Sequence, residues 1–355
     1  MSTWTFPEQL EAKRLLDAAL ADGSAHAYLF HGPPGVGKRR AAVAFAAELI
    51  GDAPRVARGT HPDLYVLEPA GDQVLIDEIR ALRRDLHMRP FEASRRVYLV
   101  LNADTMNEAA ADALLKDLEE PPEYAVIVLV ADDLGPIPET IRSRCQPIPF
   151  RRLSESAVRA DLLERAPELA EEELATIAKV AGGRLDRAER LLEPASRARR
   201  DALLDTARAV YADDGFDAGA AASSLMQGVR ERGADAKAQA EETVAAYDLT
   251  TRDADQRVKR AQRAAERDEL LASLEELAWW YRDLIAVAVG ADAAVVHSDR
   301  LEMLRADATR ELIHPAEDAC ELVRETWRAF EEFNIAPQLA LEALFVEVSR
   351  ELALG

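Results

Sequence analysis

Four residues near the start of the chain have the types and spacing of a phosphate-binding loop. Gly32, Gly35, Gly37 and Lys38 lie in the stretch AYLFHGPPGVGKRR, after an apolar run and before a helical pattern. Glycines let backbone N–H groups curl around phosphate oxygens at a helix N-terminus, and the lysine neutralises the phosphate charge. The stretch therefore predicts a P-loop, with a glycine-rich tight turn as the alternative.

Other positions of an ATPase site carry the wrong chemistry. Arg39 follows the lysine where a serine or threonine hydroxyl would bind Mg²⁺, and an arginine repels a metal ion. A second apolar run, VYLVLNADTMN, should end in acids that hold Mg²⁺ and orient water, but it ends in Leu101 and Asn102. The first acid, Asp104, is either a shifted metal ligand or the N-cap of the next helix. We therefore expect no ATP hydrolysis.

A sheet must hold these residues together, and the region 1–150 supplies its strands. The short apolar runs are 28–30, 64–67, 97–101 and 126–130, with a possible fifth at 147–150. The helical patterns between them lie near 38–50, 73–87 and 107–120. Nearly all-apolar strands that alternate with helices predict a parallel sheet covered on both faces.

Beyond residue 150 the patterns are helical only. Short helical segments cover 151–200, with a break at Gly182–Gly183, and longer ones cover 201–355. We expect helices at about 314–333 and 337–353, and an amphipathic stripe made by Leu270, Leu274, Leu277, Tyr281 and Leu284. The charged, alanine-rich stretch 231–268 is either an exposed long helix or a mobile insert. The sequence thus predicts one α/β domain followed by two all-α domains.

Composition restricts the partners and the compartment. The 355 residues include 44 Lys and Arg against 65 Asp and Glu, a net charge of −21, so the chain is a poor candidate for gripping nucleic-acid phosphates alone. We interpret local basic clusters as solvated helix faces and turns; one example consists of Arg80, Arg83, Arg84, Arg89, Arg95 and Arg96. If the protein works on DNA, its partners should supply most of the contact.

Export, membrane insertion and metal binding are not expected. No run of about 18 uncharged apolar residues exists, and acids interrupt the N-terminal stretch MSTWTFPEQLEAKRLLD where an export signal needs an apolar segment. The two cysteines, Cys145 and Cys320, make neither a disulfide framework nor a zinc site. We expect a cytoplasmic protein.

Four stretches, in this order, resemble the bacterial DNA polymerase III clamp loader, an AAA+ assembly. They are HAYLFHGPPGVGK (26–38), GTHPDLYVLEP (59–69), DALLKDLEEPP (112–122) and TIRSRC (140–145). Near the C-terminus, NIAPQLALEALFVEV (334–348) is similar to the last collar helix of the delta-prime subunits. The resemblance implies a RecA-like AAA+ P-loop domain over 1–150, a helical lid over 151–200 and an oligomerising collar over 201–355.

Within that family, three departures match delta-prime, which does not hydrolyse ATP. The gamma and tau ATPase subunits keep a P-loop hydroxyl, an Asp-Glu pair on the second strand and a lid arginine. Here Arg39 replaces the hydroxyl, Leu101 and Asn102 replace the acids, and Asp186 of GRLDRA replaces the lid arginine. The alternatives are a gamma/tau-like ATPase with unusual metal ligation, and a non-hydrolysing regulator that holds ADP or phosphate.

The second arginine of TIRSRC, in the Ser-Arg-Cys motif, has a catalytic role in the family that the chain resembles. Resemblance implies that Arg144 projects into a neighbouring subunit's ATP site as an arginine finger. A guanidinium there spreads positive charge over the γ-phosphate oxygens in the transition state and is worth about 10³–10⁵ in rate. The alternative is a local ion pair with an acid such as Asp132 or Asp133. Cys145 is expected to be a small core residue.

The resemblance also implies the partners. The chain would join gamma/tau and delta subunits in a hetero-pentamer of the DNA polymerase III holoenzyme, which loads the sliding clamp onto primed DNA. It would have no ATPase of its own, ATP being bound by the partner subunits, and it would touch DNA mainly through the complex. Many family members carry a four-cysteine zinc insert, but GDAPRVARGTHPDL has no cysteine, so zinc is not expected. His61 in that stretch is interpreted as a turn or packing residue.

Overall fold

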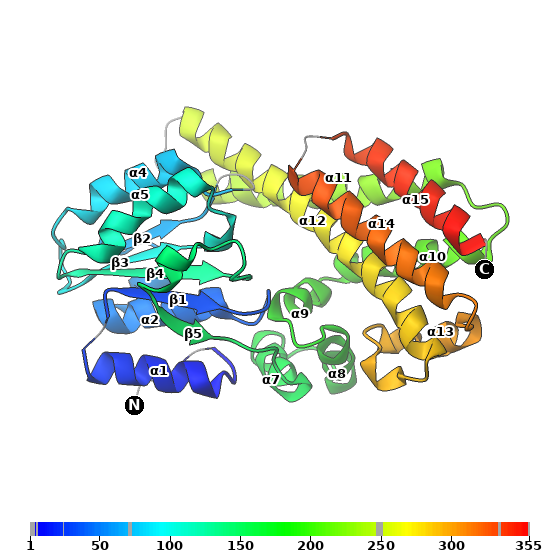
Figure 1. Ribbon diagram of the computed structural model, residues 1–355, viewed down its shortest axis with the longest axis horizontal. Coiled ribbons are helices and arrows are strands. Elements are labelled where there is room, and N and C mark those ends of the chain that lie inside the picture. The colour runs from blue at the N-terminus through cyan, green and yellow to red at the C-terminus, as the bar shows by residue number, and fades with distance from the viewer. Residues whose placement is uncertain are drawn as a thin grey trace. The chain divides into compact units, whose positions relative to one another are not determined.

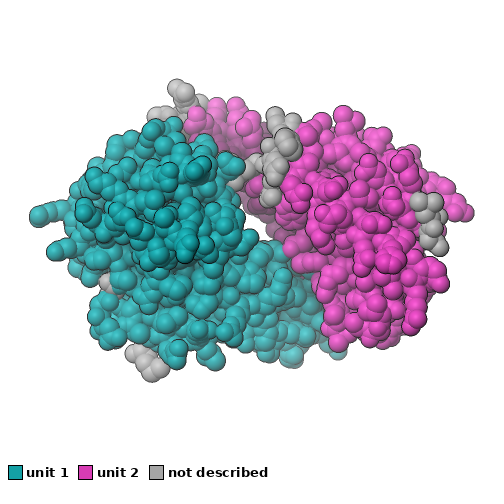
Figure 2. All heavy atoms as spheres, viewed as in Figure 1, with its two compact units in different colours: residues 1–189 teal, residues 190–355 magenta. Residues whose placement is uncertain are grey.

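The chain forms two compact units, residues 1–189 and 190–355, which Figure 2 shows in different colours. The computed structural model describes residues 4, 6–23, 25–69, 73–245, 251–332 and 335–353. The finer division into domains over 1–150, 151–200 and 201–355 stays a prediction.

Unit 1 is built on a parallel sheet of five strands. These are β1 (Ala27–His31), β2 (Leu64–Leu67), β3 (Arg96–Val100), β4 (Ala125–Ala131) and β5 (Gln146–Pro149). Their order is β2-β3-β4-β1-β5, and every neighbouring pair runs parallel. All the predicted strands, including the fifth, are confirmed. Because β3, β4 and β1 are neighbours, the segments that follow their carboxyl ends meet at one edge of the sheet.

Helices cover both faces of the sheet, as the apolar strands required (Figure 1). One face packs against α1 (Leu10–Ala21) and α2 (Lys38–Ile50). The other packs against α4 (Ile76–Leu86), α5 (Glu108–Glu119) and the short α6 (Glu139–Arg142). Successive strand residues point to opposite faces, so Tyr28 and Phe30 join one core while Ala27 and Leu29 join the other. A short α3 (Ala53–Ala57) and a 3₁₀ turn, η1 (Ala103–Thr105), complete this part.

Three helices follow the sheet: α7 (Glu155–Arg165), α8 (Glu171–Val180) and α9 (Leu185–Leu192), whose last residues fall in unit 2. The predicted break at Gly182–Gly183 separates α8 from α9. An ion network joins α7 and α9 to α2, because Arg40 pairs with Asp161 at 2.6 Å and also with Glu189. The start of α9 is thereby held against the beginning of α2.

Unit 2 is helical in the described residues. Its helices are α10 (Pro194–Ala212), α11 (Ala218–Ala245), α12 (Thr251–Ala288), α13 (Leu301–Asp307), α14 (Ile313–Glu332) and α15 (Pro337–Ala353), with 3₁₀ turns η2 (Asp292–Ala294) and η3 (Ser298–Arg300). The predicted stripe from Leu270 to Leu284 is buried in the core. No helix in the described ranges is long and apolar enough to cross a membrane.

The stretch 231–268, predicted as either an exposed long helix or a mobile insert, is helical in its described part. Residues 231–245 end α11 and residues 251–268 begin α12, and these two helices pack along each other. The intervening 246–250 lie outside the described residues, as does Asn334 of the NIAP stretch. The described part of this stretch is therefore helical, but it forms parts of two packed helices and not one exposed long helix.

A buried charge cluster fixes the loop that follows α12. His297 is fully buried, and its Nδ1 and Nε2 lie 2.9 Å from carboxylate oxygens of Asp283 and Glu276. Asp283 also accepts hydrogen bonds from the backbone N–H groups of Val296 and His297. Arg200 of α10 makes a two-point ion pair with Asp299 in the same loop. Charged side chains therefore join α10, α12 and the loop inside unit 2.

Candidate nucleotide site and arginine finger

The glycine-rich loop has the left-handed backbone of a P-loop, and its own neighbours fill the space beside it. Gly32, Gly35 and Gly37 have φ angles of 139°, 71° and 94°. A Cβ on Gly32 would lie 2.2 Å from the carbonyl oxygen of Phe150, and one on Gly35 would lie 1.9 Å from Asp186 Oδ1. Only glycine permits both the angles and these approaches.

The P-loop lysine is turned inward. Lys38 opens α2 and is only 5% exposed. Its Nζ donates hydrogen bonds to the carbonyl oxygens of Gly32 and Pro33 and lies 2.6 Å from Asp132 Oδ1. Burial lowers the pKa of Lys38, while the charge of Asp132 opposes that shift. Because an ammonium has three N–H donors, these three partners already use its hydrogen-bonding capacity.

The start of α9 lies directly on the loop. The backbone N–H of Leu185 donates to the carbonyl oxygen of Gly35 at 2.7 Å, and the carboxylate of Asp186 lies beside that glycine. Arg184, which precedes it, donates from Nη2 to Asp186 Oδ2 at 2.7 Å. Asp186 lines the pocket, at the position that the resemblance assigned to a nucleotide-binding arginine. Arg184 and Arg187, which flank it in sequence, are buried.

The hollow at this loop has no net charge among its described lining residues. It measures about 400 Å³, and its charged lining residues are three bases and three acids, Lys38, Arg39, Arg40, Asp132, Asp186 and Glu189. Each base is engaged by an acid. Arg39 makes a two-point contact with Glu68 at 2.7 and 2.9 Å, and the other two pair with Asp132 and with Asp161 and Glu189. An incoming phosphate would have to displace these pairs.

The end of the second strand offers no catalytic acid. Leu101 is buried, and Asn102 follows it with a left-handed φ of 52°. Asp104 Oδ2 accepts hydrogen bonds from the backbone N–H groups of Asp132 and Asp133, both at 3.0 Å, and burial raises its pKa. The interpretation of Asp104 as a helix N-cap was wrong, because α5 begins later and is capped by Asn107. In the described part of the chain, no group of three or more His, Cys, Asp or Glu is placed to hold a metal ion.

Arg144 has a local partner, but not an expected one. It follows α6, and its Nη2 lies 2.5 Å from Glu119 Oε1 at the end of α5, while Nη1 donates to the carbonyl oxygen of Thr140. Asp132 and Asp133, the acids suggested by the sequence, were the wrong partners; the sequence separation of 25 residues gave no signal for Glu119. The side chain of Arg144 remains 34% exposed. Cys145 beside it is buried, as expected, and burial raises its pKa to about 12.

The His61 stretch and the basic cluster have structural roles. His61 is buried, and its Nδ1 accepts a hydrogen bond from the backbone N–H of Asp63, which confirms a turn residue. Within the predicted basic cluster, ion pairs join Arg80 to Asp77, Arg83 to Asp117 and Arg96 to Asp85. The interpretation as helix faces holds for Arg80 and Arg83, which lie on α4, but it was wrong for Arg96, which lies on β3 and is buried.

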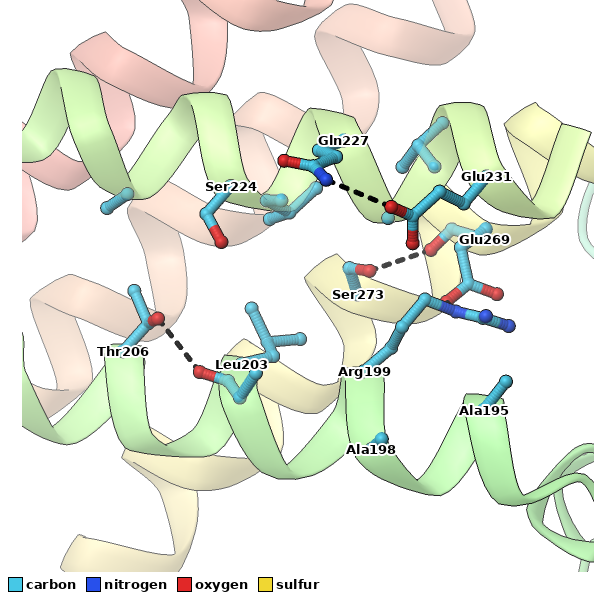
Figure 3. A pocket seen from close by; sticks show the side chains of 15 residues that line it. Ala195, Ala198, Arg199, Leu203, Thr206, Ser224, Gln227, Glu231, Glu269 and Ser273 are labelled. Atoms are coloured by element: carbon cyan, nitrogen blue, oxygen red, sulfur yellow. Dashed lines mark hydrogen bonds and ion pairs between the residues drawn. The ribbon is translucent and has the colours of Figure 1, made fainter.

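A second hollow of about 400 Å³ lies in unit 2, between α10, α11 and α12. Figure 3 shows small side chains such as Ala198 on its α10 wall, with Arg199 extending toward Glu269. Arg199 Nε lies 3.0 Å from Glu269 Oε1, and Gln227 donates to Glu231 at 3.0 Å. Ser273 and Thr206 donate to the backbone carbonyl oxygens of Glu269 and Ala202, so most polar groups of the lining already have partners and we assign no ligand to this hollow.

The first part of the chain is similar in sequence to subunits of DNA polymerase III. Residues 8–154 match the family model described as "DNA polymerase III, delta subunit". The chain is 33% identical over 165 residues to DNA polymerase III subunit delta′ of Bacillus subtilis, which is 43% of this chain and 50% of that protein. It is 37% identical over 185 residues to the delta′ subunit of Pseudomonas aeruginosa, which is 47% and 56% of the two chains. Over residues 8–154 the chain is therefore similar to clamp-loader delta-prime subunits.

The delta-prime-like match spans about half the length of these curated relatives. Subunit tau of Bacillus subtilis is 34% identical over 200 residues, which is 52% of this chain and 35% of that protein. Identity alone therefore does not separate the delta′ relatives from the tau relative.

A solved structure supports the fold over the whole length. The DNA polymerase III gamma subunit-related protein of Thermotoga maritima superposes with a TM-score of 0.50 at 17% identity, covering 96% of this chain and 99% of that one. The predicted fold class is confirmed: an AAA+ α/β domain with a RecA-like parallel sheet is followed by all-α parts.

Proposed function

We propose that this chain is a delta-prime-type subunit of a bacterial clamp loader. It joins gamma/tau and delta subunits in a hetero-pentamer that loads the sliding clamp onto primed DNA during replication. Its own P-loop hydrolyses no ATP, and Arg144 serves the ATP site of a neighbouring subunit. The relatives named delta′ support the subunit class, and the site supports the absence of hydrolysis.

The observation that carries the proposal is the inward position of Lys38. Its ammonium is held by Asp132 and two loop carbonyls, while Asp186 lies against Gly35. A working P-loop needs this lysine on the outer phosphates and a hydroxyl on Mg²⁺. Here the hydroxyl position is Arg39, which is turned to Glu68.

The exposed guanidinium of Arg144 supports the role in trans. Its pair with Glu119 is half-exposed, and such a pair is worth only about 0.2–1 kcal/mol. A γ-phosphate in a neighbouring site would compete effectively for the same guanidinium, because charge-assisted contacts strengthen when water is excluded. The local pair and the finger role are therefore compatible.

ATP turnover by the purified chain tests the inactive site. We expect no Mg²⁺-dependent hydrolysis above background. Turnover that disappears in Lys38→Ala would instead support the gamma/tau-like ATPase. Calorimetry with ADP separates the third possibility, since heat of binding at millimolar nucleotide would support a nucleotide-holding regulator.

A reconstituted complex tests the finger. Arg144→Ala should assemble normally, as judged by pull-down of the other subunits. Its DNA- and clamp-stimulated ATPase should fall, with the adjoining site slowed by about 10³-fold or more. Arg142→Ala is a matched control, because it removes an exposed arginine of the same TIRSRC stretch. Full ATPase in the Arg144 variant would show that the proposed role is wrong.

A further inference from the structure

Four basic side chains on α12 form an unpaired positive face in this strongly acidic chain. We name them the α12 basic face: Arg257, Lys259, Arg260 and Arg263. All four are exposed, and within the described ranges none makes an ion pair or hydrogen bond. Acids outnumber bases by 65 to 44 in the sequence, and Asp255 and Glu266 lie within four residues of this face, so four neighbouring bases that pair with no acid are unexpected.

The helix geometry directs these side chains away from the rest of unit 2. Sheltered residues of this part of α12 recur at Val258, Ala261, Ala265 and Glu269, a spacing of three and four that marks the side packed along α11. At 100° per residue, Arg260 and Arg263 lie on the opposite side of the helix, and Arg257 and Lys259 lie on its two flanks. Figure 1 shows α12 as a long helix, and this part is its N-terminal half.

Such an arrangement lowers the stability of the free chain. Arg257 and Arg260, and likewise Arg260 and Arg263, are three residues apart, while Lys259 and Arg263 are four apart. Like charges at these spacings repel each other and destabilise a helix. A bound polyanion would remove this repulsion, so the free energy it relieves favours binding.

We propose that the α12 basic face binds the phosphate backbone of nucleic acid. Three of its four bases are arginines, whose planar guanidinium matches phosphate oxygens at two points. The exposed uncharged residues on this side, Gln256 and Ala264, provide no aromatic or large apolar anchor of the kind that protein interfaces require. Because no aromatic side chain is available, the face cannot stack on or read nucleobases, and its binding is independent of nucleotide sequence.

The inference goes beyond the proposed function, because it gives this chain a DNA contact of its own. It rests on that function only in the choice of DNA as the natural polyanion. Its test uses the isolated chain and measures no ATPase activity. The DNA contact can therefore fail while the role of Arg144 stands, and the role of Arg144 can fail while the DNA contact stands.

The experiment is fluorescence anisotropy of a labelled random-sequence DNA duplex with the full chain, repeated over a range of salt concentrations. Four phosphate contacts predict that log K falls with log salt at a slope of about −3.6. In the variant R257Q/K259Q/R260Q/R263Q we expect binding at low salt to weaken at least tenfold and the slope to approach zero. The four positions are exposed, so circular dichroism should show an unchanged fold.

A matched variant removes the same charge from unit 1. R80Q/R84Q/R89Q/R95Q should bind the duplex with the same affinity and slope as the natural chain. The proposal is overturned if the natural chain does not bind at low salt, if the α12 variant binds equally well, or if the control loses as much. Binding of a poly-glutamate peptide through the same residues, with no binding of DNA, would assign the face to an acidic protein instead.

Discussion

Replacing Asp132 by asparagine and Asp186 by alanine should open the P-loop to phosphate. The first change removes the acid that holds Lys38 Nζ at 2.6 Å, and the second removes the carboxylate beside Gly35. The charged lining of the hollow, now three bases and three acids, would then have an excess of two positive charges. The loop backbone itself would be unchanged.

The size of the gain follows from Coulomb's law. A carboxylate about 4 Å from a phosphate oxygen costs about 1 kcal/mol in water and about 4 kcal/mol near a less hydrated protein surface. The side chains of Asp132 and Asp186 are 46% and 43% exposed, which places them near the aqueous limit. Removing both should therefore gain about 2 kcal/mol, or roughly thirtyfold in affinity.

Calorimetric titration with ADP, without Mg²⁺, measures this gain. D133N/D214A is the control, because it makes the same change of net charge at acids that do not line the hollow. Adding Lys38→Ala to the test variant should abolish the gain, since the released ammonium is the phosphate's partner. If the test variant binds ADP no better than the natural chain or the control, internal carboxylates are not what closes the loop.

Three further predictions concern other contacts. Glu119→Gln should release Arg144 and raise the ATPase of a reconstituted complex by up to about fivefold, the rate factor that corresponds to the free energy of a half-exposed ion pair. The same change should have no effect when Arg144 is already alanine, and a loss of activity would contradict the prediction. Asp283→Ala leaves the backbone N–H groups of Val296 and buried His297 without an acceptor and should lower the unfolding free energy of unit 2 by about 2–5 kcal/mol. The control Asp214→Ala should change it by less than about 0.5 kcal/mol. The measurement is urea unfolding followed by tryptophan fluorescence, which reports mostly unit 2 because Trp279, Trp280 and Trp327 lie there. Burial raises the pKa of Cys145 to about 12 and of Cys320 to about 11, so iodoacetamide at about pH 8 should label both thiols at least a hundredfold more slowly in the folded chain than in urea. The free energy of unfolding should also fall as pH rises from about 8.5, the pKa of an unfolded thiol, toward those values. Fast labelling of the folded chain would show that the thiols are not buried.

The sheet was predictable because its signal is local. Each strand is a short apolar run between helical patterns, so the run at 64–67 was recovered at its observed bounds, and the helix at 38–50 begins at the lysine that a P-loop requires. The stripe from Leu270 to Leu284 was equally visible, since one residue in three or four must face the core.

The pairing of charged side chains was not predictable. Asp132 meets Lys38 because β4 lies beside β1, and Glu119 meets Arg144 because α5 ends near α6. Such contacts depend on strand order and on where helices end, neither of which leaves a pattern in the residues themselves. The local reasoning for Asp104 failed for a related reason: its carboxylate bonds to the end of another strand, not to the helix that follows it.

The glycines of the loop have a consequence for how such motifs are used in classifying genomes. Phe150 and Asp186 occupy the space next to Gly32 and Gly35, so a larger residue at either site would disrupt folding whether or not a nucleotide ever binds. A mutational scan scored by abundance alone should therefore rank these positions with the hydrophobic core. Under the proposed function, packing alone keeps these glycines in place, and counting such a loop as a nucleotide-binding site would overstate the number of ATP-binding proteins.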